Sequence, residues 1–374
     1  MKKIFTVIGA RPQFVKAAVV SRRLREMPGY GSQFVELLVH TGQHYDHAMS
    51  EVFFEEMEIP RPDFHLNLGG GTHGQMTGLM LERIEKLLLE HKPDIVLVYG
   101  DTNSTLAGAL AASKVGIPVA HVEAGLRSHN LAMPEEINRK LTDSLSQYLF
   151  CPSQASVDNL SREGIPHVAL EHGNPCRVIN SGDVMQDAVL HYAKKCTSPK
   201  IVSTTKPNIL LTLHRQENVD HKEKLSSLQR SAKELTKTFN IIFPIHPRTR
   251  KRAEEFGLDF SFCSVSQPVG YIELLSILKC VDLVATDSGG LQKEAFFLQK
   301  PCLVLREETE WTELLESGNN ILCGTHEEHI KSNASKLISQ GFIESPDYYG
   351  SGNTGEIICQ ELIRELQEPH ERRK

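Results

Sequence analysis

The chain has 374 residues, a composition ordinary for soluble proteins and a formal net charge of −6, which together favour a two-domain globular protein. The acidic balance argues against a nucleic-acid binder, whose surface would be basic. Eight scattered cysteines without a C-x-x-C pair indicate neither a disulfide framework nor a zinc site, and favour a reducing, cytoplasmic compartment. No apolar run is long enough to span a membrane, and Arg11-Pro12 interrupts the first run where a signal peptide would continue.

Apolar runs rich in Val, Ile and Leu alternate with helical patterns along almost the whole chain. In the first half, KIFTVIG, FVELLVHTG, DIVLVYG, VAHVEAG and YLFCPS predict strands separated by helices. The pattern restarts after a polar segment with NILLTLH, IIFPIHP, DLVATDSGG and PCLVLREE. Near-continuous apolar strands between helices are typical of parallel sheets covered on both faces. We therefore predict two doubly wound α/β domains, 1–180 and 181–354, with a last helix in 355–374 packing back on the first.

Open parallel sheets bind ligands outside the carboxyl ends of their strands, so the residues that follow each strand are the candidates for function. GARPQFVK carries Arg11 and Lys16 into a helix start, a favourable setting for an anion. TGQHYDHAMSE carries Gln43 and His44, which we interpret as hydrogen-bonding residues because no three ligands share a helical face at metal-binding spacing. GARPQFVK itself is not a G-x-G-x-x-G turn, and G-x-x-x-x-G-K-[ST] occurs nowhere in the chain, so neither dinucleotide nor P-loop chemistry is indicated.

Carboxylates at neighbouring strand ends suggest acid–base chemistry. Asp101 lies in VYGDTNSTLAG, Glu123 in VAHVEAG, and Glu135 opens the next helix in PEEINR. Asp101 alone could be a helix cap, but a carboxylate at the end of the neighbouring strand weakens that interpretation. Carboxylates held close together push their pKa values apart, as general acid–base catalysis requires. Glu136 and Asn138 are expected to face elsewhere, because adjacent helical positions do not share a face.

The second half places histidines and a helix start at its strand ends. LTLHRQEN carries His214 and PIHPRTR carries His246, each beside arginines, which suggests recognition of an anion. ATDSGGLQKEA holds a turn of small residues whose backbone N–H groups can bind a diphosphate at a helix N-terminus: Ser288, Gly289 and Gly290. Glu294 lies roughly one and a half turns along, where a carboxylate can accept hydrogen bonds from ribose hydroxyls. The residues thus predict a diphosphate-and-ribose site in this half.

At these motifs the sequence resembles the non-hydrolysing UDP-N-acetylglucosamine 2-epimerase family. The matching stretches follow in order along almost the whole chain: GARPQFVK, HTGQHYD, GDTNSTLAGALAA, HVEAGLRS, PEEINR, LTLHRQEN, TDSGGLQKEA and YGSGN. The resemblance implies a GT-B fold, in which two Rossmann-like domains face a central cleft and the second holds UDP. It also implies a reaction without metal or NAD. A base removes the C2 proton, UDP leaves by anti elimination, and UDP adds again after reprotonation on the other face.

Carried across motif by motif, the resemblance implies acid or base roles for Asp101, Glu123 and Glu135. Lys16 and His214 are implied to serve the diphosphate or the charge balance of the active site. Contacts to the sugar or to UDP are implied for the remaining candidates: Arg11, Gln43, His44, Arg127, Arg139, His246, Ser288, Gly289, Gly290, Glu294 and Trp311. A UDP-sugar is the implied partner and a homodimer the implied assembly, with no nucleic acid and no membrane involved.

One departure from the family pattern bears on the substrate. Many members read T-E-R-P-E after the strand that follows D-S-G-G, whereas this chain reads REETEWTELLE, with Trp311, its only Trp, in place of that arginine. Trp311 alters the sugar contacts, or it only packs while Arg306 or Arg127 compensates. GGGTHGQMTG and GDVMQDA are similar to a branch that acts on UDP-2,3-diacetamido-2,3-dideoxyglucuronate and yields the mannuronate epimer for surface polysaccharide.

The diacetamido uronate is therefore the favoured substrate, and UDP-N-acetylglucosamine is the alternative. Three other interpretations of the motifs compete with a non-hydrolysing epimerase. A UDP-sugar glycosyltransferase shares the fold, a hydrolysing epimerase releases free sugar, and a nucleotide-sugar sensor binds without exchanging the C2 proton.

Overall fold

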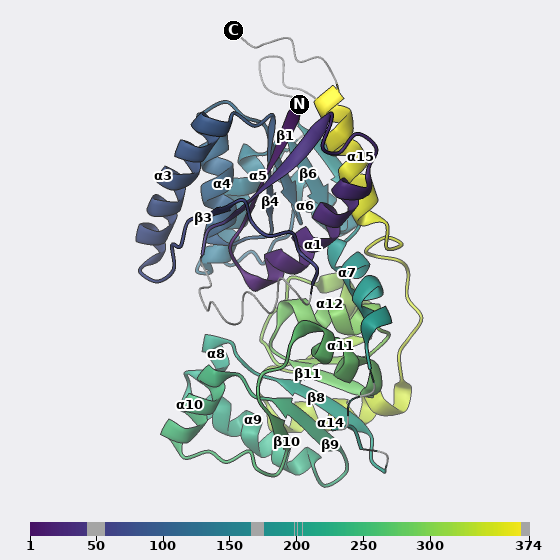
Figure 1. The fold of residues 1–374 in the computed structure, drawn as a ribbon. Helices are drawn as coiled ribbons and strands as arrows, with labels where there is room; N and C mark the ends of the chain where they lie inside the picture. Colours follow the sequence, from purple (N-terminus) through teal and green to yellow (C-terminus); the bar gives the residue numbers. More distant parts are fainter. Residues whose placement is uncertain (43–56, 166–175, 198, 200, 204, 368–374) are drawn as a thin grey trace. The chain divides into compact units, whose positions relative to one another are not determined.

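The structure, a computed structural model, describes residues 1–42, 57–165, 176–197, 199, 201–203 and 205–367 (Figure 1). The chain folds into two compact units, Met1–Ala188 with Asp347–Lys374, and Val189–Pro346. We call these the first unit and the second unit. Each contains one parallel β-sheet, as the alternation of apolar runs and helical patterns predicts. The chain is therefore an α/β protein with two Rossmann-like sheets.

The sheet of the first unit has the strand order β3-β2-β1-β4-β5-β6-β7. Its strands are β1 (Lys2–Ile8), β2 (Phe34–His40), β3 (Phe64–His65), β4 (Ile95–Tyr99), β5 (Val119–Val122), β6 (Tyr148–Cys151) and β7 (Arg177–Asn180). β1 pairs in parallel with β2 on one side and with β4 on the other, so the chain order reverses between β1 and β4. Open α/β sheets bind ligands at such a reversal, outside the carboxyl ends of the strands.

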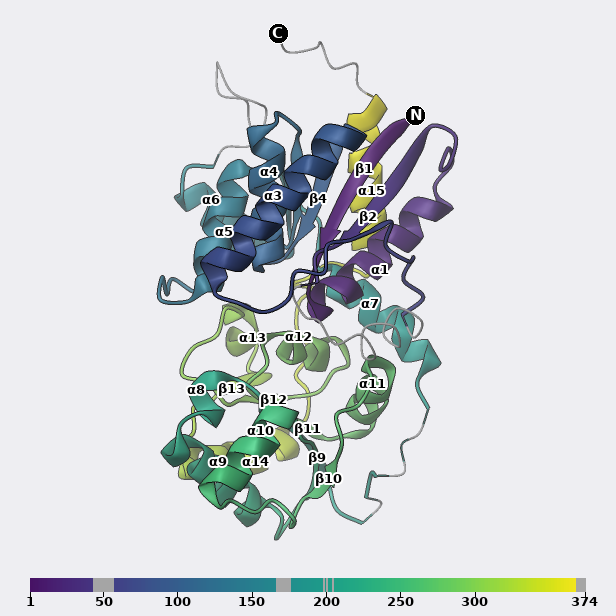
Figure 2. The same cartoon turned by 60° about the vertical axis from the view of Figure 1, so that its left-hand side comes forward.

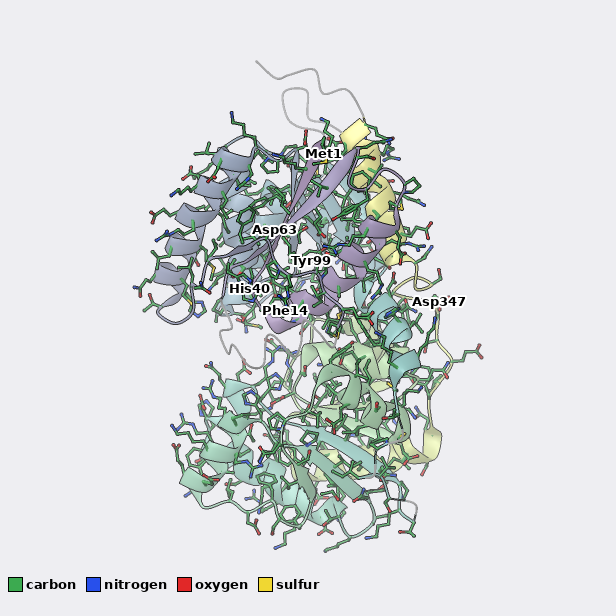
Figure 3. The ribbon with its side chains drawn as sticks, in the orientation of Figure 1. Met1, Phe14, His40, Asp63, Tyr99 and Asp347 are labelled. Carbon is green, nitrogen blue, oxygen red and sulfur yellow. The ribbon has the colours of Figure 1, made fainter. Side chains whose placement is uncertain are left out.

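Helices cover both faces of this sheet (Figures 1 and 2). They are α1 (Arg11–Glu26), α3 (His73–His91), α4 (Asn103–Lys114), α5 (Pro134–Leu145), α6 (Gln154–Arg162) and α15 (Thr354–Gln367). A further helix, α7 (Val184–Tyr192), begins in the first unit and ends in the second. One face packs α3 and α4 against Phe5, Val7 and Val98. On the other face, Phe14 of α1 stacks on His40 at the end of β2, with 5.0 Å between ring centroids (Figure 3).

The last helix returns to the first unit and packs beside α1. Cys359 Sγ donates to the Val20 carbonyl at 3.6 Å, and Arg23 forms an ion pair with Glu356. These interactions join the two ends of the chain within one unit.

The first unit extends beyond the boundary expected at residue 180 because hydrogen bonds hold the start of α7 to the returning chain. Asp183 donates its backbone N–H to the Tyr349 carbonyl at 2.7 Å. Asp187 accepts from the Gly355 backbone at 2.8 Å. The boundary between the two units accordingly lies after Ala188, inside α7.

The sheet of the second unit has the strand order β10-β9-β8-β11-β12-β13. Its strands are β8 (Asn208–Thr212), β9 (Asn240–Pro244), β10 (Ser264–Ser266), β11 (Leu283–Thr286), β12 (Cys302–Val304) and β13 (Asn320–Leu322). Its helices are α8 (Gln216–Val219), α9 (Lys222–Leu235), α10 (Pro247–Phe256), α11 (Tyr271–Cys280), α12 (Gly289–Phe297), α13 (Thr312–Glu316) and α14 (Glu327–Gln340), with a 3₁₀ turn at Ala193–Lys195. Here the chain order reverses between β8 and β11.

A hydrophobic core joins this second sheet to α9 and α14. Leu228 and Leu235 of α9 and Ile330 of α14 pack on Leu211 and Phe243 of the strands. Because β9 and β11 both pair with β8 in parallel, the residues that follow these three strands lie at one edge of the sheet. Among the residues described in both units, no helix is long and apolar enough to cross a membrane.

Candidate active site

Lys16 and Glu123 form an ion pair at the carboxyl edge of the first sheet. Lys16 lies in the second turn of α1, and Glu123 follows β5 directly. Lys16 Nζ contacts Glu123 Oε2, and each side chain is only 9% exposed. The turn after β4 lies close by, since a Cβ added to Gly100 would be 3.4 Å from Lys16 Nζ and 3.6 Å from Glu123 Oε2. The structure thus brings together two of the predicted residues, which lie far apart in sequence.

Glu123 has a backbone conformation that residues other than glycine rarely adopt. Its φ is +73°, in the left-handed region, which costs a non-glycine residue roughly 1–2 kcal/mol. The backbone N–H groups of Glu123 and Ala124 both donate to the Phe150 carbonyl of β6, each at 3.0 Å. Strained residues persist where their surroundings over-determine them, and they cluster at functional sites.

Asp101 and Arg139 form a second charge pair at the same sheet edge. Arg139 NH1 donates to Asp101 Oδ2 at 2.6 Å. Arg139 Nε and NH2 both donate to Glu136 Oε2, at 3.0 and 2.7 Å. Asn138 Nδ2 donates to the Asp101 carbonyl at 2.9 Å. Three residues of α5 therefore form one network around Asp101, whose own side chain is 34% exposed.

The expectation that Glu136 and Asn138 face elsewhere is wrong. Glu136 is fully buried, whereas Glu135 is exposed in the first turn of α5. Burial by itself raises the pKa of Glu136, but hydrogen bonds from the Ser128 backbone and from Arg139 outweigh it and hold the pKa below its usual value. Adjacent helical residues do point in different directions, but here Glu136 faces the network and Glu135 faces solvent.

Arg127 lies in a buried chain of charges behind this edge. Its NH1 donates to Asp143 Oδ2 at 2.7 Å, and its Nε and NH2 donate to Glu163 at 2.9 and 2.7 Å. Its side chain has no exposed surface. Burial by itself lowers the pKa of Arg127, but Glu163 and Asp143 raise it above its usual value. Asp143 Oδ1 is also hydrogen-bonded to Nδ1 of the His121 ring, 2.7 Å away. The guanidinium of Arg127 is therefore bound by carboxylates of the protein itself.

In the second unit, Asp287 holds the turn that carries His214. Asp287 is fully buried after β11, and its carboxylate accepts from the backbone N–H groups of His214 and Arg215 at 3.1 Å and from Asn218 Nδ2 at 3.3 Å. The His214 and His246 rings, at the ends of neighbouring strands β8 and β9, have centroids 6.0 Å apart. The structure therefore brings the two predicted histidines together, and both are exposed.

The predicted small-residue turn begins α12. Ser288 is the N-cap, and its Oγ accepts from the Leu291 backbone at 3.4 Å. A Cβ added to Gly289 would be 2.3 Å from Glu310 Oε1, so a larger residue there would displace the Glu310 carboxylate, whereas Gly290 is exposed with open space beside it. The first backbone N–H groups of a helix lack intrahelical acceptors and suit an anion. Glu294 lies on the same helix and is 6% exposed.

Trp311 is buried at the N-cap of α13, with 3% of its surface exposed. Lys293 Nζ lies 3.9 Å from the centroid of its ring, a cation–π contact. Next to Trp311, Glu310 accepts a hydrogen bond of 2.8 Å from Arg306 NH1. Burial by itself raises the pKa of Glu310, but Arg306 and, at longer range, Arg215 hold it below its usual value. A Cβ added to Gly289 would be 3.6 Å from Trp311 Nε1, so the indole ring lies beside the start of α12.

Three predicted residues cannot be placed in this way. Gln43 and His44 lie outside the described residues, and of Arg11 only the backbone, at the start of α1, is described. Among the described residues, no group of three or more His, Cys, Asp or Glu is arranged to hold a metal ion.

The sequence and the fold both match known proteins along almost their whole length. The model of the UDP-N-acetylglucosamine 2-epimerase family matches residues 31–363. The UDP-2,3-diacetamido-2,3-dideoxy-D-glucuronate 2-epimerase of Pseudomonas aeruginosa is 48% identical, over 97% of this chain and 99% of its own. A UDP-N-acetylglucosamine 2-epimerase of Methanococcus maripaludis is 43% identical, over 98% of this chain and 99% of its own.

Solved structures show the same fold. The crystal structure of the Methanocaldococcus jannaschii UDP-GlcNAc 2-epimerase in complex with UDP-GlcNAc and UDP has a TM-score of 0.86 at 41% identity, covering 97% of this chain and 100% of its own. The Neisseria meningitidis enzyme bound to UDP-GlcNAc has a TM-score of 0.86 at 32% identity, with 97% and 100% coverage. The α/β fold with two parallel-sheet domains is thus the GT-B-like fold of these enzymes. The chain therefore belongs to the UDP-N-acetylglucosamine 2-epimerase family and is an isomerase of the kind that acts on UDP-sugars.

Proposed function

We propose that this enzyme inverts C2 of a UDP-2-acetamido sugar by anti elimination and re-addition of UDP, without a cofactor. The base removes the C2 proton, and the electron pair of the C2–H bond forms the C1–C2 double bond. The C1–O bond breaks, and UDP leaves with its electron pair. Reprotonation of C2 on the other face and addition of UDP to C1 complete the inversion. The observation that carries the proposal is a pair of carboxylates at neighbouring strand ends. Asp101 is hydrogen-bonded to Arg139, and Glu123 forms an ion pair with Lys16.

Inversion needs proton transfer on both faces of the sugar, and therefore more than one acid–base group. Asp101 and Glu123 follow adjacent strands, and a basic side chain orients each of them. Glu135, exposed at the start of α5, is the third member of the proposed set. Lys16 and Arg139 balance the charge of the carboxylates, and Arg127 orders the network around Asp143.

The second unit is proposed to hold UDP. The start of α12, at Ser288, Gly289 and Gly290, binds the diphosphate, because helix N-termini favour anions. Glu294 accepts hydrogen bonds from the ribose hydroxyls, and the exposed His214 and His246 face the leaving phosphate. Arg11, Gln43 and His44 remain predicted contacts to the sugar or to UDP.

The proposed substrate is UDP-2,3-diacetamido-2,3-dideoxyglucuronate, converted to the mannuronate epimer for surface polysaccharide. Two observations support it. The relative of that name is 48% identical over almost the full length of both chains. Trp311 also stands where an arginine is common, and it packs against the start of α12. UDP-N-acetylglucosamine is the second candidate, since relatives at 43% identity carry that name.

Proton NMR in D2O tests both the reaction and the substrate. The purified protein is incubated with each UDP-sugar in turn, with no cofactor added, and the C2 proton signal and the manno epimer are followed. Exchange with the diacetamido uronate alone supports the proposed substrate, and exchange with UDP-N-acetylglucosamine favours the second candidate. Release of UDP and free sugar indicates a hydrolysing enzyme. Binding without exchange of either substrate favours a glycosyltransferase or a sensor, and contradicts the proposal.

We also propose that the enzyme acts in the cytoplasm as a homodimer, as the family resemblance implies. Sedimentation equilibrium of the purified chain tests the assembly, and a monomer across micromolar concentrations contradicts it. Fractionation of the producing cell tests the compartment.

A further inference from the structure

We propose that His121 is a positioning residue of the acid–base site, which holds the Gly100 carbonyl and so fixes the place of Asp101. The inference rests on the proposed epimerase function, because it concerns the same site. His121 itself is fully buried in β5, so it acts through the backbone and not on the substrate.

His121 lies where strands β4 and β5 separate. Their last paired residues are Tyr99 and Val122, and Gly100 N donates to the Val122 carbonyl at 2.9 Å. Immediately beyond this hydrogen bond, each strand is followed by a residue in the left-handed backbone region: Gly100 after β4, with a φ of +62°, and Glu123 after β5, with a φ of +73°. Asp101 and Glu123, the two carboxylates proposed to transfer protons to and from the sugar, thus both follow the point where β4 and β5 separate, one after each strand.

The contacts of the ring define which nitrogen donates. His121 Nε2 lies 2.7 Å from the Gly100 carbonyl oxygen. A carbonyl oxygen only accepts, so Nε2 carries a proton in this hydrogen bond. His121 Nδ1 lies 2.7 Å from Asp143 Oδ1, and Arg127 NH1 and Gly125 N hold Asp143 Oδ2 at 2.7 and 3.1 Å. A carboxylate fixed in this way fixes the plane of the ring, so Nε2 points at Gly100.

Gly100 needs such a hold because glycine has little conformational preference of its own. The peptide that joins Gly100 to Asp101 is held at its carbonyl by His121, and the next carbonyl, that of Asp101, accepts from Asn138 Nδ2 at 2.9 Å. Arg139 holds the carboxylate itself. Side chains from β5 and α5 therefore hold both peptides that flank Asp101. A misplacement of about 1 Å at a reacting group can lower a rate by about 100-fold, so this hold matters for proton transfer.

Two variants of His121 separate its two contacts. In His121→Gln the side-chain amide nitrogen can replace Nε2 and keep the bond to Gly100. In His121→Asn the shorter amide can replace Nδ1 and keep the contact to Asp143 only. We expect kcat to fall by about 100-fold in His121→Asn with little change in KM, and to return to within ~10-fold of the wild type in His121→Gln. Equal losses in both variants overturn the proposal. Thermal unfolding and UDP titration of each variant show whether it is folded and binds UDP, and kcat is compared only among variants that do.

NMR of the full-length protein gives a second readout that does not depend on activity. With nitrogen-labelled histidine, we expect a protonated Nε2 on His121, and an unprotonated Nε2 overturns the proposal. The Asp101 amide signal should shift more in His121→Asn than in His121→Gln, and the reverse order also overturns it. Failure of the wild-type enzyme to exchange the C2 proton would contradict the proposed function alone, and the NMR readouts would still decide the role of His121.

Discussion

Asp101 accepts a hydrogen bond of 2.6 Å from the guanidinium of Arg139. The same guanidinium donates twice to the buried carboxylate of Glu136, one turn back on α5. Two carboxylates bound to one planar group fix its orientation, because the donors of arginine form a rigid fork. The direction in which Asp101 points therefore depends on Glu136, a residue that need not touch the substrate.

Removal of the Glu136 carboxylate should destabilise the first unit. In Glu136→Ala, Arg139 loses two hydrogen bonds in a buried setting, and the backbone N–H groups of Ser128 and His129 lose their acceptor. Breaking a buried ion pair by removing one partner costs about 3–5 kcal/mol. Urea unfolding followed by circular dichroism measures the loss.

The exposed neighbour Glu135 provides the matched control. Glu135→Ala should change the free energy of unfolding by no more than ~0.5 kcal/mol, as for most surface substitutions. The two variants also differ in pH dependence. The folded-state pKa of Glu136 is lowered, so its stabilisation is complete above the unfolded pKa of about 4.3 and is lost as the pH falls through the folded value. An equal loss of stability in both variants would show that Glu136 does not hold the network.

Glu123→Gln should abolish turnover while UDP still binds. The substitution keeps the shape of the side chain but removes the proton acceptor beside Lys16. Loss of a positioned acid or base lowers rates by roughly 10²- to 10⁴-fold. C2 proton exchange in D2O and calorimetric titration with UDP measure the two properties separately. Near-normal exchange would remove Glu123 from the chemistry.

Glu294→Ala should mainly weaken nucleotide binding. A hydrogen bond to a charged group contributes about 1.5–3 kcal/mol, which corresponds to a rise in the UDP dissociation constant of roughly 10- to 100-fold. The exposed carboxylate of Glu328 on α14 provides the control, and Glu328→Ala should bind UDP normally. Unchanged UDP affinity in Glu294→Ala would refute its ribose role.

Trp311→Arg should destabilise the second unit. The substitution replaces an aromatic ring with a cation beside Lys293, a residue that is 1% exposed. It removes a cation–π contact of about 0.5–2 kcal/mol and adds repulsion between two buried positive charges. Trp311→Phe keeps an aromatic face and should lose less stability. Guanidinium unfolding of the two variants, followed by circular dichroism, compares them, and equal stability would show that Lys293 does not depend on the ring.

Glu36→Gln should gain stability relative to the wild type as the pH rises. Glu36 is buried in β2, and its Oε1 accepts from Thr6 at 2.6 Å and Ser21 at 2.9 Å. Burial raises the pKa of this carboxyl, so the folded state prefers the protonated form. Wild-type stability therefore falls as the pH rises from the unfolded pKa of about 4.3 to the raised folded value, and the neutral Gln is spared this loss. Unfolding free energies of both proteins from pH 4 to 8 test the difference, and parallel curves would contradict it.

The central strands of both sheets could be predicted because buried parallel strands are continuous apolar runs, as DIVLVY and NILLTL are. The edge strands β3 and β10 could not be predicted, for the opposite reason. β3 has two residues and β10 reads SVS, so neither carries an apolar signal. Glu136 could have been found from the sequence, since Glu136, Arg139 and Asp143 recur at the spacing of one helical face.

By itself, the sequence determined the α/β class, the positions of the strand ends and the chemical types of the residues that follow them, since these depend on local patterns and composition. Only the tertiary structure decided which of those residues meet. Two contacts join segments from different elements: the ion pair of Lys16 with Glu123 and the hydrogen bond of His121 with Gly100. The burial of Glu136 in place of Glu135 likewise depends on the elements that pack against α5. The order of strands in a sheet and the direction of each side chain depend on packing across the whole domain, which no local pattern encodes.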